Sequence, residues 1–172
     1  MTVAAGPFLI AATLLVLGGV LKARHPIDTA NALRGVGVPA TPSLVRAGAV
    51  AETAIGIWAV VVGDRASAVC VVLSYGVFAV FIAVALLRRV PIASCGCFGK
   101  ADTPPSLVHL GINAGAITAA MAVAFDPGVG LADVLAEQPL AGIPMLILIG
   151  TGAFLAVVAM SGLPRVLAAA RC

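Results

Sequence analysis

Long apolar stretches separated by short polar connections run the whole length of the chain. A helix needs about 20 apolar residues to cross a hydrocarbon core of roughly 30 Å, because each residue advances the helix by about 1.5 Å. The stretches that meet this requirement cover residues 4–22, 44–62, 66–87, 105–125 and 140–162. The pattern therefore predicts an all-α fold, a polytopic membrane helix bundle with about five transmembrane helices.

The connections between these stretches predict how the helices follow one another. Only "GDR" (63–65) separates the second and third stretches, which indicates an antiparallel helix pair. The first connection, 23–43, is the longest, and Asp28 or Thr29 is placed to cap a short interfacial helix over residues 30–34. No long polar linker divides the chain, so residues 1–172 are expected to form a single integral membrane domain.

Glycine spacing suggests where helices approach one another closely. Gly48 and Gly56 flank an acidic residue on the second stretch, and Gly111 and Gly115 form a GxxxG motif on the fourth. Small residues allow the backbones of membrane helices to come close together. We expect these glycines to serve packing inside the bundle, with a dimer interface as the alternative.

Composition agrees with a membrane location. The chain is 62% hydrophobic and 10% charged, whereas a soluble domain carries about 25% charged residues. The lipid bilayer is therefore an expected partner. A nucleic-acid partner is not expected, because the sequence has no basic run and few aromatic residues.

The distribution of basic residues predicts an orientation. Nearly all of them fall in the 22–46 connection, the 88–102 connection and the C-terminal segment, and only Arg65 belongs to the other face. The residues on the basic face are Lys22, Arg24, Arg34, Arg46, Arg88, Arg89, Lys100, Arg165 and Arg171. Since cytoplasmic loops of membrane proteins carry the excess of Lys and Arg, the N-terminus is expected outside and the C-terminus inside.

Two cysteines lie one glycine apart in the connection between the third and fourth stretches. Cys95 and Cys97 must bend toward each other to form a disulfide, whose Cα atoms lie about 4.4–6.8 Å apart, and Gly96 permits such a bend. A strained, exposed disulfide is easily reduced, and nearby basic residues favour the reactive thiolate. The spacing thus suits a redox pair.

Two other interpretations of this pair stay open on spacing alone. Two thiolates are half of a tetrahedral zinc site, whose other ligands would come from His25, His109 or Cys172. Alternatively, the segment is a glycine turn that only happens to contain thiols. Cys70, alone in the third stretch, is expected to be a small apolar side chain.

The segment "PIASCGCFG" (91–99), set between two membrane helices in a chain rich in Ala, Gly and Val, resembles the MauE (methylamine utilisation) family. That family is grouped with the DoxX-like redox-associated membrane proteins. The resemblance implies thiol–disulfide chemistry in a bacterial cell membrane, with a thioredoxin-like partner and an exported client protein. It assigns Cys95 and Cys97 as the redox pair, with Gly96, Phe98 and Gly99 shaping the turn.

Polar residues inside the apolar stretches are further candidates. Glu52 is the only acidic residue in a stretch, and ionisable groups in a membrane mark functional sites by default. We expect it to face the bundle interior as a proton carrier or as a structural hydrogen-bonding group. His109 and Asn113 share a helix face. His109 is expected to act as base to a cysteine or to sit at the interface as a hydrated histidine.

Taken together, the sequence predicts a multi-pass membrane thiol–disulfide redox protein, an oxidoreductase component that supports the maturation of exported proteins. The alternatives are a thiolate-based metal carrier and a structural membrane subunit that stabilises a partner. No cofactor is evident, and a quinone and a thiol-bound metal both stay open. Because charge places the cysteines at the cytoplasmic end, we expect 91–102 to fold back into the bundle and to reach a donor inside and an acceptor outside.

Overall fold

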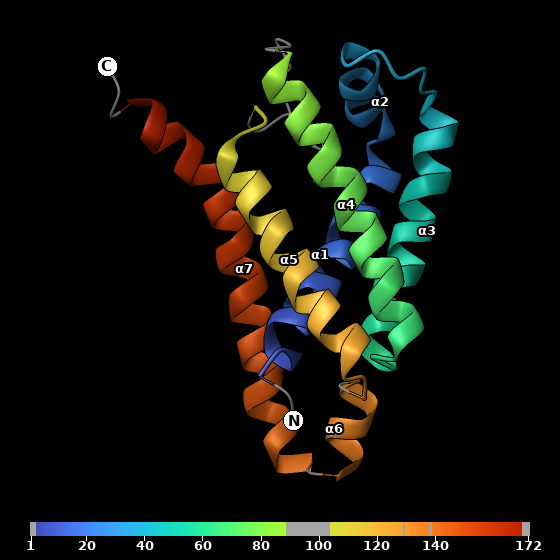
Figure 1. Cartoon of the computed structure of the whole chain (residues 1–172), viewed down its shortest axis with the longest axis vertical. Coiled ribbons are helices and arrows are strands. Elements are labelled where there is room, and N and C mark those ends of the chain that lie inside the picture. The colour runs from blue at the N-terminus through green and yellow to red at the C-terminus, as the bar shows by residue number, and fades with distance from the viewer. Residues whose placement is uncertain (1–2, 89–103, 129, 138, 170–172) are drawn as a thin grey trace.

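The computed structural model describes residues 3–88, 104–128, 130–137 and 139–169, and every regular element within these ranges is a helix (Figure 1). The helices, in chain order, are α1 (Ala5–Arg24), α2 (Pro26–Gly35), α3 (Pro42–Val61), α4 (Arg65–Leu87), α5 (Leu107–Phe125), α6 (Leu131–Glu137) and α7 (Pro139–Ala169).

Five of the described helices are long and apolar enough to cross a membrane. They are α1, α3, α4, α5 and the part of α7 from Gly142 to Pro164. This confirms the predicted helical membrane bundle. The start of α1 and the end of α7 lie at opposite ends of the bundle, and α2, the end of α4 and the start of α5 lie at the same end as the end of α7 (Figure 1). Which end faces the cytoplasm stays a prediction.

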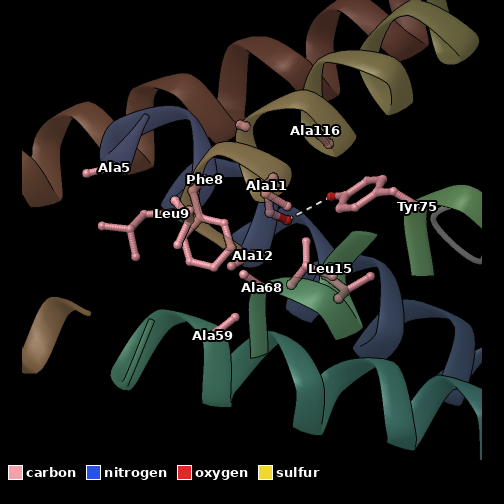
Figure 2. Close-up of a cluster of buried hydrophobic side chains, with 14 of the residues drawn as sticks. Ala5, Phe8, Leu9, Ala11, Ala12, Leu15, Ala59, Ala68, Tyr75 and Ala116 are labelled. Carbon is pink, nitrogen blue, oxygen red and sulfur yellow. Dashed lines mark hydrogen bonds between the residues drawn. The ribbon is translucent and has the colours of Figure 1, made fainter. Parts of the chain in front are cut away.

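Helix α1 is the centre of the bundle. In its membrane-spanning window 61% of the residues are buried, against 22–33% in the other four spans. Phe8, Leu9 and Leu15 form a core with alanines of α3, α4 and α5, as Figure 2 shows. The outer faces of the other helices remain apolar, with Leu73 of α4 64% exposed. An exposed apolar face of this kind is suited to lipid rather than to water.

Helices α1 and α3 run antiparallel and cross at two glycines. A Cβ atom on Gly19 would lie 2.7 Å from the Ala49 carbonyl oxygen, and one on Gly56 would lie 2.9 Å from the Ala12 carbonyl oxygen. Because backbone atoms at such a crossing cannot move aside, only glycine fits. The expectation that Gly56 serves close packing is therefore correct.

The other glycines singled out by spacing behave differently. A Cβ atom on Gly48, Gly111 or Gly115 would meet nothing within 4 Å among the described residues. The GxxxG motif of α5 therefore does not pack inside this bundle, contrary to expectation. The motif lies on an exposed face of the helix, because Ala116, Ala119 and Ala120 turn the other face inward.

The first connection also differs in detail from the prediction. Helix α2 begins at Pro26 and has no side-chain cap, so Asp28 and Thr29 lie within its first turn instead of capping it. Proline fits this position because the first amide of a helix has no partner inside the helix. By contrast, Asp64 caps α4 by accepting a hydrogen bond from the Ser67 backbone amide at 2.8 Å. This cap closes the expected α3–α4 hairpin.

Candidate functional site

The predicted redox segment falls in residues 89–103, outside the residues that the structure describes. This applies to Cys95, Gly96, Cys97, Phe98 and Gly99. The described chain stops at Arg88 and resumes at position 104, both at the α2 end of the bundle (Figure 1). The Arg88 guanidinium donates a hydrogen bond to the Val36 carbonyl oxygen at 3.2 Å, which ties the end of α4 to the end of α2.

Glu52 faces the bundle interior and forms an ion pair with Lys22. The side chain of Lys22 is 6% exposed and that of Glu52 is 19% exposed. Counting Lys22 with the basic residues of the first connection was therefore wrong. It lies inside α1, three residues after Gly19, and so continues the face of α1 that packs on α3.

The register of α3 brings Glu52 to the same place. Val45, Ala49, Gly56 and Ala59 are the buried residues of α3. Glu52 falls between them at helical spacing, and residues three or four apart share a helix face. The buried face of α1 thus packs against the buried face of α3, and this packing places Lys22 opposite Glu52.

Two aromatic residues of α4 surround the ion pair. The Lys22 ammonium lies 4.1 Å from the centre of the Phe78 ring, a cation–π contact that stabilises a cation away from water. Phe78 meets Tyr75 edge to face, with ring centres 5.9 Å apart. The Tyr75 hydroxyl donates to the Ala11 carbonyl oxygen at 2.7 Å (Figure 2). Tyr75 thereby ties α4 to α1.

His109 and Asn113 extend the polar residues along α5. His109 is 2% exposed, and its Nδ1 lies 2.8 Å from the Ser106 hydroxyl oxygen. Asn113 donates from Nδ2 to the His109 carbonyl oxygen at 2.6 Å. Its Oδ1 is buried and has no hydrogen-bond partner among the described atoms. An unpaired buried acceptor of this kind is costly and calls for a ligand or a water.

Two cavities adjoin the ion pair and share Lys22, Glu52 and Phe78 as walls. The smaller, of about 50 Å³, is also lined by Tyr75 and Asn113. A cavity needs about 10–15 Å³ of such volume to hold a water molecule, which also needs two to four polar partners, so this cavity suits water. The larger, of about 220 Å³, extends on the other side of the pair below α2.

The cysteine that the structure describes lies away from this site. Cys70 is a free thiol in the second turn of α4, at the end of that helix where α3 and α4 are joined. No group of three or more His, Cys, Asp or Glu residues placed to hold a metal ion occurs in the described part of the chain.

Sequence reasoning missed Lys22 and Phe78 as members of the site. A signal for Lys22 was present: positions 15, 18, 19 and 22 follow one another at helical spacing, and Lys22 completes an apolar stripe. Nothing in the sequence distinguishes Phe78 from other apolar residues of α4, because its role depends on contact with another helix.

Comparison with known proteins identifies a family. A search of curated proteins and a search of solved structures returned no match. The family model described as methylamine utilisation protein MauE matches residues 1–126. This range contains α1 to α5, the Lys22–Glu52 pair and the segment with both cysteines. The chain therefore belongs to the MauE family of membrane proteins, as its CGCFG segment suggested.

Proposed function

We propose that this membrane protein is a thiol–disulfide oxidoreductase component whose Cys95 and Cys97 exchange electrons with a thioredoxin-like partner. In a bacterial cell membrane, it would support disulfide handling in exported proteins. The observation that supports this proposal is where the cysteine segment is attached. The segment joins α4 to α5 at the end of the bundle where the polar site begins with Ser106 and His109.

The proposed exchange balances in two steps. The thiolate of one cysteine attacks a disulfide of the partner, so a mixed disulfide forms and one partner thiolate leaves. The second cysteine then attacks the mixed disulfide, closing the Cys95–Cys97 disulfide and releasing the second partner thiolate. Two electrons pass to the partner, and two thiol protons pass from this chain to it. The reverse sequence carries electrons the other way.

His109 and Glu52 are proposed to handle the protons of this exchange. An attacking cysteine must lose its proton, and a neutral histidine is a suitable acceptor. His109 lies in the first turn of α5 and contacts the Ser106 hydroxyl. Glu52, the carboxylate paired with Lys22, offers a second proton acceptor deeper in the bundle.

Thiol trapping tests the redox pair. Membranes containing the protein are treated with an alkylating reagent that adds mass, with and without prior reduction. A reductant-dependent shift is expected in the native protein and in Cys70→Ser, and it should disappear in Cys95→Ser and Cys97→Ser. A pair that stays in one state while the partner turns over contradicts the proposal.

The same variants separate the alternatives. A metal carrier predicts that the purified protein holds a stoichiometric amount of zinc, copper or another soft metal, lost in Cys95→Ser. A structural subunit predicts that Cys95→Ser and Cys97→Ser leave the level and activity of the partner intact. Either result, together with the absence of a reductant-dependent shift in the trapping experiment, would favour the corresponding alternative over the proposed function.

A further inference from the structure

The larger cavity beside the ion pair lies between α2, α3 and α4. Most of its lining residues come from α2, from the first half of α3 and from the second half of α4, and these parts of the helices lie at the same end of the bundle (Figure 1). Its volume is about 220 Å³. Its lining includes Lys22, Glu52, Phe78 and Phe81.

The wall positions indicate where a ligand would come from. Leu44 of α3 is 61% exposed and Val77 of α4 is 67% exposed, and both line the cavity. Both helices belong to the membrane-spanning set. The cavity therefore borders a surface suited to lipid, so a ligand would enter from the bilayer and must be soluble in it.

The inner wall of the cavity indicates which chemical groups of that ligand would lie deepest. Apolar side chains form most of the wall, but the inner side carries the Lys22–Glu52 pair. The end of an acyl chain placed there would keep water and hydrogen-bonding groups away from two charges, which is unfavourable. A carbonyl oxygen instead accepts a hydrogen bond from the ammonium, and a hydroxyl donates one to the carboxylate.

Two phenylalanines and the smaller cavity indicate that the ligand carries a flat ring and exchanges protons. Phe78 and Phe81, one turn apart on α4, both line the cavity, and aromatic rings pack favourably against other flat rings. Behind the pair, the smaller cavity and the unpaired Oδ1 of Asn113 provide a site for water. A ligand that gains and loses protons at the pair would have water close by.

We infer that the larger cavity binds a lipid-soluble quinone or its quinol, with a ring oxygen at the Lys22–Glu52 pair. A quinone takes up two electrons and two protons to become a quinol. A dithiol releases the same two electrons and two protons when it forms a disulfide, so a quinone and Cys95–Cys97 would be matched reactants. This redox pairing rests on the proposed function, whereas the binding site does not.

Filling the cavity tests the binding site. A Cβ on Gly48 would meet nothing within 4 Å among the described residues, and Gly48 lines the cavity, so Gly48→Phe blocks it without displacing α3. Gly150 has the same free space around its Cβ and lies on α7, away from the cavity. Gly150→Phe is therefore the matched control.

Binding is measured with a benzoquinone carrying a decyl chain, added to the purified full-length protein. Trp58, the only tryptophan of the chain, lies on α3 about 9 Å along the helix from Glu52, so a bound quinone should quench its fluorescence. Saturable quenching is expected, with Kd at least tenfold higher in Gly48→Phe and unchanged in Gly150→Phe. No saturable quenching, or equal Kd in both variants, overturns the inference.

The polar end is tested by removing both charges together. The double variant Lys22→Met with Glu52→Gln leaves no unpaired buried charge, and its Kd for the quinone should rise at least tenfold. Decylbenzene, which has the same chain and no ring oxygen, should not displace the quinone. Equal competition by decylbenzene or by phospholipid would show an unselective apolar cavity and overturn the inference.

The cysteine variant separates this inference from the proposed function. Quinone binding in Cys95→Ser should equal that of the native protein. Binding without a redox cycle at the cysteines would leave the quinone site in place and contradict only the proposed function. A redox cycle at the cysteines without saturable quinone binding would contradict the quinone site and leave the proposed function in place.

Discussion

At the scale of the residue, the central feature is a charged pair inside a membrane bundle. Lys22 and Glu52 are both largely removed from solvent and contact each other. Ionisable groups in such places are stable only when paired, because an isolated charge loses its hydration. Phe78 adds a favourable contact to the cation, so the site holds the ammonium from two sides.

Removing one member of this pair should destabilise the protein strongly. Lys22→Met leaves the Glu52 carboxylate buried without its cation, at an expected cost of about 3–5 kcal/mol in the free energy of unfolding. The double variant Lys22→Met with Glu52→Gln should recover most of this loss. Unfolding in detergent, followed by circular dichroism, measures both. A single variant as stable as the native protein would contradict the role of the pair.

At the scale of the element, α1 and α3 are held together by close backbone contact. Gly19 and Gly56 each face backbone atoms of the opposite helix. In a membrane, close packing and polar contacts drive helix association, since lipid is as apolar as the side chains. This crossing also fixes the register in which Lys22 meets Glu52, so the packing of two elements creates the site.

Alanine at the crossing should therefore be harmful. In Gly56→Ala the new methyl group would lie 2.9 Å from the Ala12 carbonyl oxygen and the Val16 amide nitrogen. Separating the helices to relieve this overlap should cost about 1–3 kcal/mol. Gly150→Ala, with open space at its Cβ, is the control and should be neutral. Equal stability of the two variants would show that the crossing tolerates a side chain.

At the scale of the whole molecule, the helix order brings the larger cavity and the ends of several helices together at one end of the bundle. Helix α2, the end of α4 and the start of α5 lie at the same end of the bundle (Figure 1). Helix α2 forms part of the wall of the larger cavity, and the 89–103 segment is attached at the same end of the bundle. The opposite end carries α6 and the α3–α4 hairpin (Figure 1). The positive-inside rule predicts that the end of the bundle with α2 and the larger cavity faces the cytoplasm.

Labelling from one side of the membrane tests this orientation. In a background without other cysteines, Cys95 alone should react with a membrane-impermeant thiol reagent only when the cytoplasmic face is open to it. Asp126→Cys, at the exposed end of α5 far from α2, should react only from the outside. Labelling with the sides exchanged would reverse the orientation.

The amino-acid sequence alone was sufficient to predict the class of fold and the family. Apolar length predicts the five spans because a bilayer of fixed thickness demands about 20 residues from each. The CGCFG segment pointed to the MauE family because two thiols around a glycine form a local, recognisable pattern. Glu52 was found because a lone carboxylate stands out in an apolar stretch.

The tertiary structure decided what these residues meet. Lys22 lies near a helix end, where a basic residue fits a loop as well as a span, and only the α1–α3 crossing shows that it pairs with Glu52. The GxxxG motif of α5 was misjudged because small residues show that a close approach is possible, and not which face has a neighbour. Local sequence fixes helices and their periodicity, while pairing between helices depends on contacts far apart in the chain.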